Sequence, residues 1–512
     1  MSVRMLAKVN SVAVNGLDAQ AVEVEVDLAS GLPMFTVVGL PDPTVRESRE
    51  RVRSALRNSG FTFPQRRVTV NLAPADLRKE GAAFDLPIAI GILAAEGVIP
   101  LEILQHFVMV GELSLEGGIK SVHGILSMAL FFKDRPIKGF LVPKENGAEA
   151  TIVDGVPIYP AVTVPEVIEF LNGRQAIAPV QRPPLVEDTF AVGMPDFAEV
   201  RGQQHAKRAL EVAAAGGHNV LLIGPPGSGK TMLAQRLSGI LPAMTQNEAI
   251  ESTRIHSVAG ILPSDQPLLR TRPFRAPHQS ISDAGLLGGG TTPRPGEVSL
   301  AHNGVLFLDE LPEYRRNVLE GLRQPLEDGT ICITRAAASF TYPARMMLIA
   351  AMNPCPCGFL GDRVRPCICS AAQIQRYRAK VSGPLLDRLD LHIEVPAVPF
   401  RELATEDRGE ASEGIRSRVI AARNIQTQRY QESRTHSNAQ LRPGQLRKYC
   451  RLDGPGRALI EQAVTRLGLS ARAYMRIIKV ARTIADLNGG GGISSAHVAE
   501  AVQYRSLDRP LS

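Results

Sequence analysis

The spacing of apolar residues divides the chain into three predicted regions and a linker. In residues 1–173, short strand-like apolar runs alternate with helix-like ones, which indicates a domain of mixed helices and strands. In residues 196–400, strand-like runs again alternate with helical patterns, which predicts an α/β core around a parallel sheet. Residues 401–512 are helical in pattern, with a flexible spot at Gly489–Gly492. Residues 174–195 hold four prolines and few periodic apolar positions, which predicts a linker.

A glycine-rich loop in the second region carries the strongest chemical signal. It follows an apolar run at 219–223 and precedes a helix-like stretch at 231–241, which Pro242 ends. In this strand–loop–helix setting such a loop binds phosphate, because backbone N–H groups and the helix N-terminus face the anion. A plain glycine-rich turn would match the pattern by chance in roughly 2% of chains of this length. The predicted loop consists of Gly224, Pro225, Pro226, Gly227, Ser228, Gly229, Lys230 and Thr231.

Four polar side chains complete a predicted site for ATP hydrolysis. Lys230 is expected to reach the β- and γ-phosphates, and the Thr231 hydroxyl to ligate Mg²⁺. A second apolar run, 304–308, ends in two carboxylates: Asp309 fits the other Mg²⁺ contact, and Glu310 fits a general base that activates water. An ordinary strand that runs into an acidic turn would look the same in isolation. Together with the phosphate loop, a hydrolytic site is the better interpretation.

Length and composition are those of a multidomain globular protein. The 512 residues are enough for about two to four domains, and a hydrophobic content of 44% with a charged content of 21% is typical of soluble chains. No apolar run reaches the ~18 residues that a membrane helix needs. Arg4, Lys8 and Asn10 interrupt the N-terminus, which makes it a poor signal peptide. These features predict a cytoplasmic protein without a membrane partner.

The net charge of +7 is unevenly placed. Residues 401–512 contain 19 Lys and Arg against 11 Asp and Glu, whereas the rest of the chain is close to neutral. A basic region of this kind either contacts the phosphates of a nucleic acid or forms a solvated helical face. Charge alone slightly favours the solvated face.

Two phrases in the second region resemble the magnesium-chelatase-like clade of AAA+ ATPases, which lies near the MCM helicases. They are Ala350–Gly358, with the sequence AAMNPCPCG, and Ser382–Asp390, with the sequence SGPLLDRLD. The match covers nearly the whole chain and is most similar to the bacterial YifB/ComM family. This resemblance implies a Lon-protease-like α+β domain over 1–173, an AAA+ core with a parallel sheet over 196–400 and a helical lid over 401–512.

The same resemblance implies roles for three polar residues. Asn353 resembles sensor 1, an amide that positions the lytic water beside the γ-phosphate. Arg388 resembles the arginine finger, which acts on the ATP of a neighbouring subunit and so implies a ring, usually of six. Arg472 resembles sensor 2 of the lid, with Arg476 as its rival. A guanidinium suits both tasks because it is always charged and binds phosphate oxygens bidentately. Without the resemblance, a surface salt bridge is the better interpretation of each arginine.

Two segments of the first region resemble those around the catalytic dyad of Lon proteases. They are Lys79–Asp85, where Lon carries its serine, and Gly111–Gly117, after which its lysine follows. In this chain the serine position falls on Ala83 and the lysine position near Leu126. A Ser–Lys dyad needs an oxygen nucleophile and an amine base, so the resemblance implies a Lon-like fold without protease chemistry. Two nearby residues that are misplaced in the pattern are Ser114 and Lys120.

Four of the six cysteines form a cluster. They occur as two Cys-x-Cys pairs separated by nine residues, and in a cytosolic chain such clustering favours a metal over a disulfide. Four thiolates fit tetrahedral Zn²⁺, although pairs with two or more intervening residues are commoner. Free thiols or redox chemistry are the alternatives. The predicted ligands, in the loop 355–369 that follows Asn353, are Cys355, Cys357, Cys367 and Cys369.

Two segments are candidates for contact with DNA. Residues 329–343 form two strand-like runs around a turn of small residues, which predicts a hairpin whose only charge is Arg335. In the clade that the chain resembles, a hairpin at this place lines the ring channel. Residues 270–296 resemble an insertion of that clade and offer Arg275 and Arg294. Mobile basic loops in a channel can follow a phosphate backbone; packing between subunits is an equally good interpretation.

Three functions are compatible with these features. The first is a ring-forming, ATP-driven motor on DNA, which the family resemblance implies to act as a helicase or in branch migration during recombination of incoming DNA. The second is an ATP-driven chaperone that remodels a partner enzyme, as in magnesium chelatase. The third, an ATP-dependent protease, lacks its dyad residues. The expected partners are a hexameric ring of copies and single-stranded, forked or branched DNA, with ATP, Mg²⁺ and Zn²⁺ as cofactors.

Overall fold

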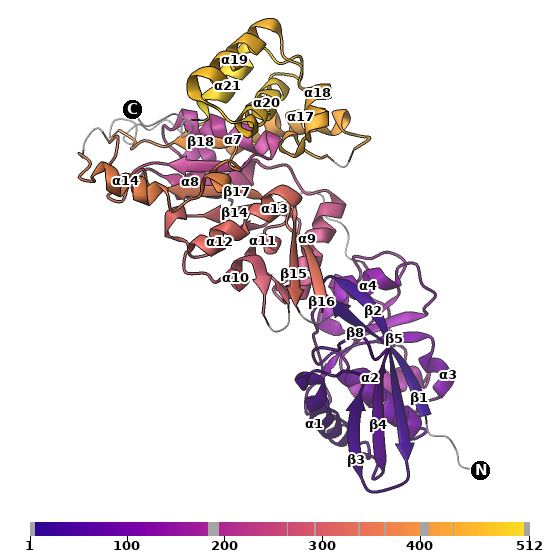
Figure 1. Cartoon of the computed structure of the whole chain (residues 1–512). Coiled ribbons are helices and arrows are strands. Elements are labelled where there is room, and N and C mark those ends of the chain that lie inside the picture. The colour runs from indigo at the N-terminus through magenta and orange to yellow at the C-terminus, as the bar shows by residue number, and fades with distance from the viewer. Residues whose placement is uncertain are drawn as a thin grey trace. The chain divides into compact units, whose positions relative to one another are not determined.

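The structure of the protein is a computed structural model, drawn in Figure 1. It describes residues 6–182, 194–263, 265–290, 293–335, 338–362, 365–399, 409–433 and 435–505. The chain forms two compact units: the first combines Met1–Glu187 with Ala249–Leu269, and the second combines Asp188–Glu248 with Arg270–Ser512. Parts of the predicted linker and of the predicted lid lie outside the described residues.

The first unit is built on a mixed, seven-stranded sheet. Its strand order is β3-β4-β2-β1-β5-β8-β9. Strands β1, β2 and β4 pair antiparallel, whereas β3 is parallel to β4, and β1, β5, β8 and β9 pair parallel. A separate hairpin is formed by β6 (Glu112–Leu113) and β7 (Ile119–Lys120). The strands of the sheet span Leu6–Asn15 (β1), Asp18–Ala29 (β2), Met34–Val38 (β3), Arg67–Ala73 (β4), Phe107–Met109 (β5), Gly139–Pro143 (β8) and Ile158–Ala161 (β9).

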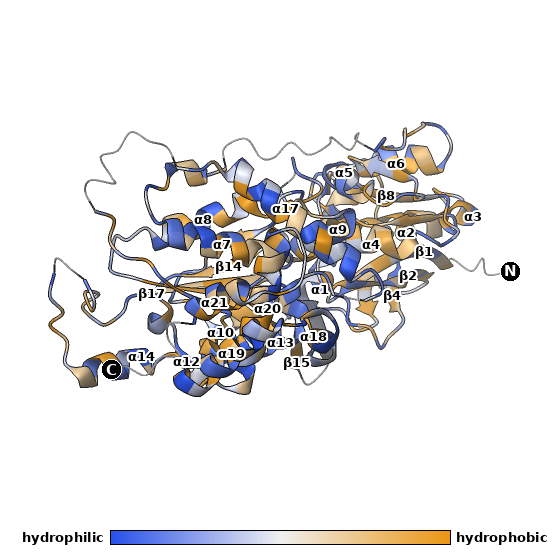
Figure 2. Cartoon of the chain, turned by 90° about the horizontal axis from the view of Figure 1, so that it is seen from above, coloured by the Kyte–Doolittle hydropathy of each residue, from blue (hydrophilic) through white to orange (hydrophobic). Residues whose placement is uncertain are grey.

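Helix α2 (Asp85–Ala95) forms the centre of this unit's core. All 11 of its residues are buried, because it is apolar on every side after its first residue. It packs so closely on β2 that a Cβ at Gly91 would lie 2.6 Å from Cγ2 of Val26. In Figure 2, α2 and β1 lie among the orange, hydrophobic residues. The other helices are α1 (Pro43–Asn58), α3 (Leu101–Leu104), α4 (Ile125–Phe132), α5 (Gly147–Ala150) and α6 (Val164–Leu171).

A segment from further along the chain completes the first unit. Helix α9 (Gln246–Ala259) belongs to this unit from Ala249 onward. Its Ser257 donates a hydroxyl hydrogen to the buried carboxylate of Glu149. The same carboxylate accepts the N–H of Leu126 at 2.9 Å, so it joins the inserted helix to α4. The pattern of apolar residues gave no sign of this insertion.

The second unit contains a five-stranded sheet whose neighbouring strands are all parallel, as predicted. Its order is β11-β14-β17-β10-β18. The apolar runs predicted at 219–223 and 304–308 are β10 and β14. Because the strands share one direction, the residues that follow them meet at one edge of the sheet. The strands span Val220–Ile223 (β10), Phe274–Arg275 (β11), Val305–Leu308 (β14), Met347–Met352 (β17) and Leu391–Glu394 (β18).

Helices flank this sheet and form the C-terminal part of the chain. α7, α17 and α20 share one hydrophobic core with the sheet strands. The predicted hairpin at 329–343 is confirmed: β15 (Thr330–Arg335) pairs antiparallel with β16 (Ala338–Pro343). A smaller hairpin joins β12 (Gly288–Gly289) to β13 (Arg294–Pro295). The helices are α7 (Gln204–Gly216), α8 (Lys230–Arg236), α10 (Asp283–Leu287), α11 (Glu297–Leu300), α12 (Arg316–Gly321), α13 (Arg323–Asp328), α14 (Ala371–Arg378), α15 (Gly383–Leu386), α17 (Ser412–Arg429), α18 (Pro443–Tyr449), α19 (Gly454–Leu467), α20 (Ala471–Leu487) and α21 (Ser495–Gln503).

The predicted helical pattern of the C-terminal region is therefore confirmed for α17 to α21. Within the described residues, no helix combines the length and the apolar character needed to cross a bilayer.

Replacing Glu149 with alanine is expected to loosen both α4 and the inserted part of α9 in the full-length chain. The change leaves the Leu126 N–H and the Ser257 hydroxyl without their buried acceptor, which costs about 1–3 kcal/mol for each group. Hydrogen–deuterium exchange should become faster in both helices. Glu145→Ala, an exposed neighbour, is the matched control. Equal protection of α9 in the two variants would show that Glu149 does not hold the insertion.

Candidate functional site

The predicted phosphate loop lies between β10 and α8. Gly227 and Gly229 have φ angles of 75° and 90°, left-handed values that favour glycine. Gly224 packs so closely against the chain after β18 that a Cβ would lie 2.1 Å from the carbonyl oxygen of Val395. Helix α8 begins one residue earlier than the sequence pattern predicts. Three glycines are thus required by the shape of this loop, as expected for backbone that wraps around an anion.

The ammonium group of Lys230 is surrounded by oxygen atoms. Its Nζ donates to the carbonyl oxygens of Gly224 at 2.8 Å and Pro225 at 2.9 Å, and to Oδ1 of Asn353 at 3.2 Å. Lys230 is only 8% exposed. Burial lowers its pKa, while the two carboxylates after β14 act in the opposite direction. The site therefore presents a desolvated ammonium near two carboxylates, an arrangement suited to nucleotide phosphates with Mg²⁺.

The two carboxylates after β14 have different surroundings. Thr231 donates its hydroxyl to Oδ2 of Asp309 at 2.7 Å, so the two groups predicted to ligate Mg²⁺ are in contact. The other oxygen of Asp309 accepts the N–H of Glu310 at 2.9 Å. Glu310 is exposed and has a φ of 51°, a left-handed conformation that is uncommon for glutamate. The structure thus separates a Thr–Asp pair suited to Mg²⁺ from an accessible carboxylate suited to activating water.

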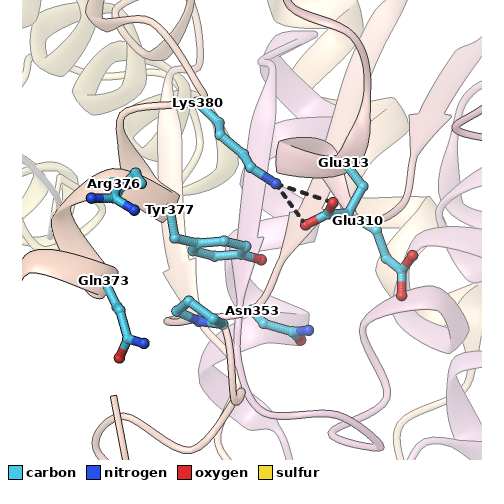
Figure 3. A pocket seen from close by; sticks show the side chains of 8 residues that line it. Glu310, Glu313, Asn353, Gln373, Arg376, Tyr377 and Lys380 are labelled. Atoms are coloured by element: carbon cyan, nitrogen blue, oxygen red, sulfur yellow. Dashed lines mark hydrogen bonds and ion pairs between the residues drawn. The ribbon is translucent and has the colours of Figure 1, made fainter. Parts of the chain in front are cut away.

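A cavity of about 460 Å³ opens beside Glu310, and Figure 3 shows its lining. Lys380 and Glu313 form an ion pair of 3.1 Å there. Helix α14 contributes Tyr377, whose phenol lies beside the backbone N–H of Asn353. Burial raises the pKa of Tyr377 to about 12, so the phenol stays protonated at neutral pH. The cavity brings the predicted base and the predicted sensor 1 to one water-accessible space.

Arg388 lies at the opposite end of the sheet. Strand β18 runs parallel to β10, with Leu391 opposite Val220 at the start of both strands. Arg388 comes before the start of β18, whereas the phosphate loop follows the end of β10. Strand β10 is about 13 Å long. The Arg388 side chain is almost buried, donates to the carbonyl oxygen of Pro384 at 2.6 Å and pairs with Glu327. The length of the sheet therefore separates this guanidinium from the phosphate loop of its own chain.

The two arginines considered for sensor 2 differ in their contacts. Arg476 pairs with the buried Asp390 and donates to the carbonyl oxygen of Arg388 at 3.3 Å. Arg472, one turn earlier on α20, is exposed, and within the described part of the chain it makes no hydrogen bond or ion pair. Burial lowers the pKa of Arg388, and the positive charges of Arg472 and Arg476 add to this effect. All three guanidinium groups thus gather at the same end of the sheet.

A buried polar cluster joins that end of the sheet to α20. Asp390 lies 3.2 Å from Nδ1 of His218 and accepts the N–H of Asn219 at 3.2 Å. The other ring nitrogen of His218 lies 2.8 Å from the Thr483 hydroxyl of α20. Burial alone would raise the pKa of Asp390, but Arg476 and His218 outweigh it and hold that pKa well below its usual range.

The four predicted zinc ligands gather in the loop after β17. Their sulfur atoms all lie within 4.8 Å of one another. The Cys355 sulfur lies 3.4 Å from that of Cys357 and 3.6 Å from that of Cys367. Four sulfurs around tetrahedral zinc at about 2.3 Å would be about 3.8 Å apart, so the cluster fits this metal. Backbone N–H groups of Phe359 and Ile368 lower the pKa of Cys357 to about 6, whereas burial and the neighbouring cysteines raise the pKa of Cys367 and Cys369.

The three predicted DNA contacts have different environments. Arg275 forms a bidentate ion pair with Glu297, at 2.6 and 2.7 Å. Arg294 is exposed on β13. Arg335 is the last residue of β15, and its side chain lies outside the described residues. Only Arg275 is therefore seen in a fixed contact within its own chain.

Several residues around the site were missed by reasoning from the sequence. Tyr377, Lys380 and Glu313 line the cavity, but each stands in an unremarked polar or helical stretch. His218 directly precedes the predicted apolar run, where a single histidine has no distinguishing pattern. Of these residues, only Asp390 stood in a sequence segment that resembles the family, Ser382–Asp390.

Family models of magnesium chelatase match most of the chain. The model for magnesium chelatase, subunit ChlI, matches residues 196–403, another for subunit ChlI matches 24–146, and a ChlI C-terminal model matches 409–505. The competence protein ComM of Haemophilus influenzae is 48% identical, over 99% of this chain and 98% of its own. The chain belongs to the magnesium-chelatase-like YifB/ComM family.

Other relatives agree with this membership. YifB of Escherichia coli K12 is 45% identical over 99% of this chain and 98% of its own. The maternal DNA replication licensing factor mcm6 of Xenopus tropicalis is 22% identical, over 62% of this chain and 37% of its own. The family resemblance predicted from the sequence is confirmed. The parallel sheet and the C-terminal helices are consistent with an AAA+ type, and membership of the YifB/ComM family supports nucleotide binding.

The changes Lys230→Ala and Glu310→Gln are expected to separate ATP binding from turnover. The first removes a charge-assisted contact with phosphate, so ATP affinity should fall at least about tenfold. The second removes only the base, so affinity should persist while hydrolysis falls about 10²–10⁴-fold. Binding of a fluorescent ATP analogue and release of phosphate measure the two effects. Glu320→Gln, which removes a carboxylate outside the cavity, is the control; equal ATP affinity in the wild type and Lys230→Ala would refute the first expectation.

Proposed function

We propose that the chain is an ATPase that assembles into a ring, with each ATP bound between two copies. The observation that carries this proposal is the separation of the parts: Lys230 and Asn353 meet at one edge of the sheet, and Arg388 lies at the other. A finger at the far edge serves the next copy. When the arginine finger of every copy contacts the ATP of the next copy, the assembly closes as a ring. We propose six copies, the usual number that the AAA+ resemblance implies.

In this proposal the residues at the phosphate loop divide the work of hydrolysis. Backbone N–H groups of the loop and the Lys230 ammonium bind the phosphates of ATP. Thr231 and Asp309 hold Mg²⁺, whose charge offsets the negative charge that develops on the phosphates. Glu310 accepts the proton of the attacking water, and Asn353 orients that water. We propose Zn²⁺ at the four clustered cysteines as a further cofactor.

We assign the finger to Arg388 and sensor 2 to Arg472. Among the described residues, the Arg388 guanidinium is bound only by Glu327 and the carbonyl oxygen of Pro384, and Glu327 is half exposed, so the ion pair can exchange for a phosphate. Arg472 is exposed, whereas Arg476 is engaged with Asp390. Because Arg472 lies near Arg388, both guanidinium groups act on the same neighbouring ATP in this assignment.

DNA is the substrate that we propose for this motor, with helicase action or branch migration during recombination of incoming DNA as the task. Two relatives support it by name: one is a competence protein and another a DNA replication licensing factor. The hairpin of β15 and β16 carries one charge, Arg335, at the end of β15. We propose that Arg335 and the exposed Arg294 contact the DNA backbone, while Arg275 braces the insertion through Glu297.

A chaperone that remodels a partner enzyme is the second candidate, because the matching family models are those of a magnesium chelatase subunit. A protease is disfavoured. We propose that the first unit is a Lon-like fold without a dyad: Leu126 belongs to an apolar cluster of this unit, and Ala83 packs against the same cluster. Ser114 uses its hydroxyl to accept the N–H of Gly118 at 3.0 Å, and Lys120 is exposed.

Mixing two inactive variants tests the finger in trans. Arg388→Ala and Lys230→Ala should each hydrolyse little ATP alone. In an equal mixture, about a quarter of the interfaces combine an intact loop with an intact finger, so about a quarter of the wild-type rate should return. Phosphate release measures it. The double variant Lys230→Ala/Arg388→Ala is the control partner, because mixing it with Arg388→Ala creates no complete interface. No recovery in the first mixture would count against a finger in trans.

Hydrolysis of ATP in the presence of single-stranded, forked or four-way DNA tests the substrate. We expect DNA to stimulate it, and Arg335→Ala to weaken DNA binding about equally for all sequences, with the salt slope lowered by about one. Basal hydrolysis should survive. Arg345→Ala, an exposed arginine at the base of the same hairpin, is the matched control. If Arg335→Ala leaves the DNA affinity, its salt dependence and DNA unwinding unchanged, the hairpin is not the DNA contact. If DNA never stimulates ATP hydrolysis by the wild type, the chaperone replaces the motor as the proposed function.

A further inference from the structure

The cysteine loop, residues 355–369, is tied at both ends to Asn353. Strand β17 ends at Met352, so Cys355 follows the predicted sensor 1 by two residues. After Cys369 the chain enters α14, which a reciprocal Ser370–Gln373 capping box begins. The far end of α14 then returns to the start of the loop.

Two contacts make this return. The Tyr377 phenol lies beside the backbone N–H of Asn353, and both residues line the cavity next to Glu310. Arg378 donates through Nε to the carbonyl oxygen of Pro354 at 3.3 Å. The described residues between 353 and 378 therefore form a closed excursion from the end of β17, and the four sulfur atoms gather inside it.

The same loop presses on the phosphate loop. Gly358 has a φ of 85°, and its N–H donates to the carbonyl oxygen of Cys355 at 3.0 Å, which forms a tight turn over the first cysteine pair. A Cβ at Gly358 would lie only 2.6 Å from Cδ of Pro226. The turn that holds two of the sulfurs thus rests directly on the ring of a phosphate-loop residue.

Little else holds this loop in place. Among its described residues, only Cys355 and Gly358 are buried, and Ile368, between the second pair of cysteines, is 86% exposed. A segment without an apolar core of its own needs another source of folding free energy, and a metal bound by four thiolates supplies it in small domains.

We infer that zinc bound by the four cysteines positions the phosphate loop and Asn353, so that nucleotide affinity depends on this metal. The inference rests on the proposed nucleotide site. The metal fixes the turn at Gly358, the turn supports Pro226, and the closed excursion holds Asn353 beside Lys230. The cysteines are positioning residues in this inference, because none of them lines the cavity beside Glu310.

Three full-length variants test this dependence. Cys367→Ser removes one ligand, and Cys450→Ser removes a cysteine outside the cluster as the matched control. Gly358→Ala keeps all four thiols but places a methyl group against Pro226 in a left-handed backbone conformation. Zinc content and the affinity for a fluorescent ADP are measured for each, together with hydrogen–deuterium exchange in residues 223–231. Wild-type protein is also measured after zinc removal with a chelator and after zinc is added back.

The wild type and Cys450→Ser should bind about one zinc per chain. Cys367→Ser and the chelated wild type should lose zinc and bind fluorescent ADP about tenfold more weakly, with faster exchange in the phosphate loop, and added zinc should restore only the wild type. Gly358→Ala should keep its zinc and still lose affinity.

Distinct outcomes overturn distinct claims. Wild-type protein that binds no zinc, even when zinc is added, refutes the inference and leaves the proposed motor intact. Loss of zinc with ADP affinity within twofold of the wild type refutes the positioning role. Wild-type affinity in a zinc-loaded Gly358→Ala refutes the contact with Pro226 as its route. Wild-type protein that holds zinc but binds no nucleotide refutes the proposed function itself.

Discussion

The desolvated ammonium of Lys230 is the interaction on which the site depends. It donates hydrogen bonds to three neutral oxygen atoms, two from its own loop and one from Asn353. This arrangement requires β10 and β17 to lie side by side in one register, with Ile223 opposite Met352. A slip of one residue would move Asn353 by about 3.3 Å and reverse its direction. The apolar strands thus serve mainly to bring one lysine and one amide together.

The same two strands connect the site to the other end of the sheet. Asn219, just before β10, accepts the N–H of Leu348 in β17 at 2.8 Å and donates to the carbonyl oxygen of Arg388 at 3.1 Å. One amide side chain therefore ties both strands to the segment that carries the predicted finger. The cluster of His218 and Asp390 extends this connection to α20. A shift of α20 would be transmitted to Arg388 through buried hydrogen bonds, which are costly to break.

Local pattern was enough to predict part of this structure. The strands at 219–223 and 304–308, the glycine-rich loop, the hairpin and the C-terminal helices each follow from short sequence windows, and the structure contains them. The insertion of residues 249–269 into the first unit was missed, because it depends on contacts with residues far away in the sequence, such as Glu149 and Leu17. The lining of the cavity was missed for the same reason. Roles that rest on the family resemblance, such as that of Arg472, remain predictions.

The ion pair of Arg388 with Glu327 has a consequence for the free subunit. An arginine that is almost buried and paired within its own chain binds another anion only when that pair opens. On the proposed assignment, an isolated copy holds its nucleotide beside a complete set of loop residues and still lacks the guanidinium that the reaction needs. The rate of ATP hydrolysis per chain then rises with protein concentration, because only assembled copies have complete sites. Dilution separates the copies, so single copies do not hydrolyse ATP without doing work.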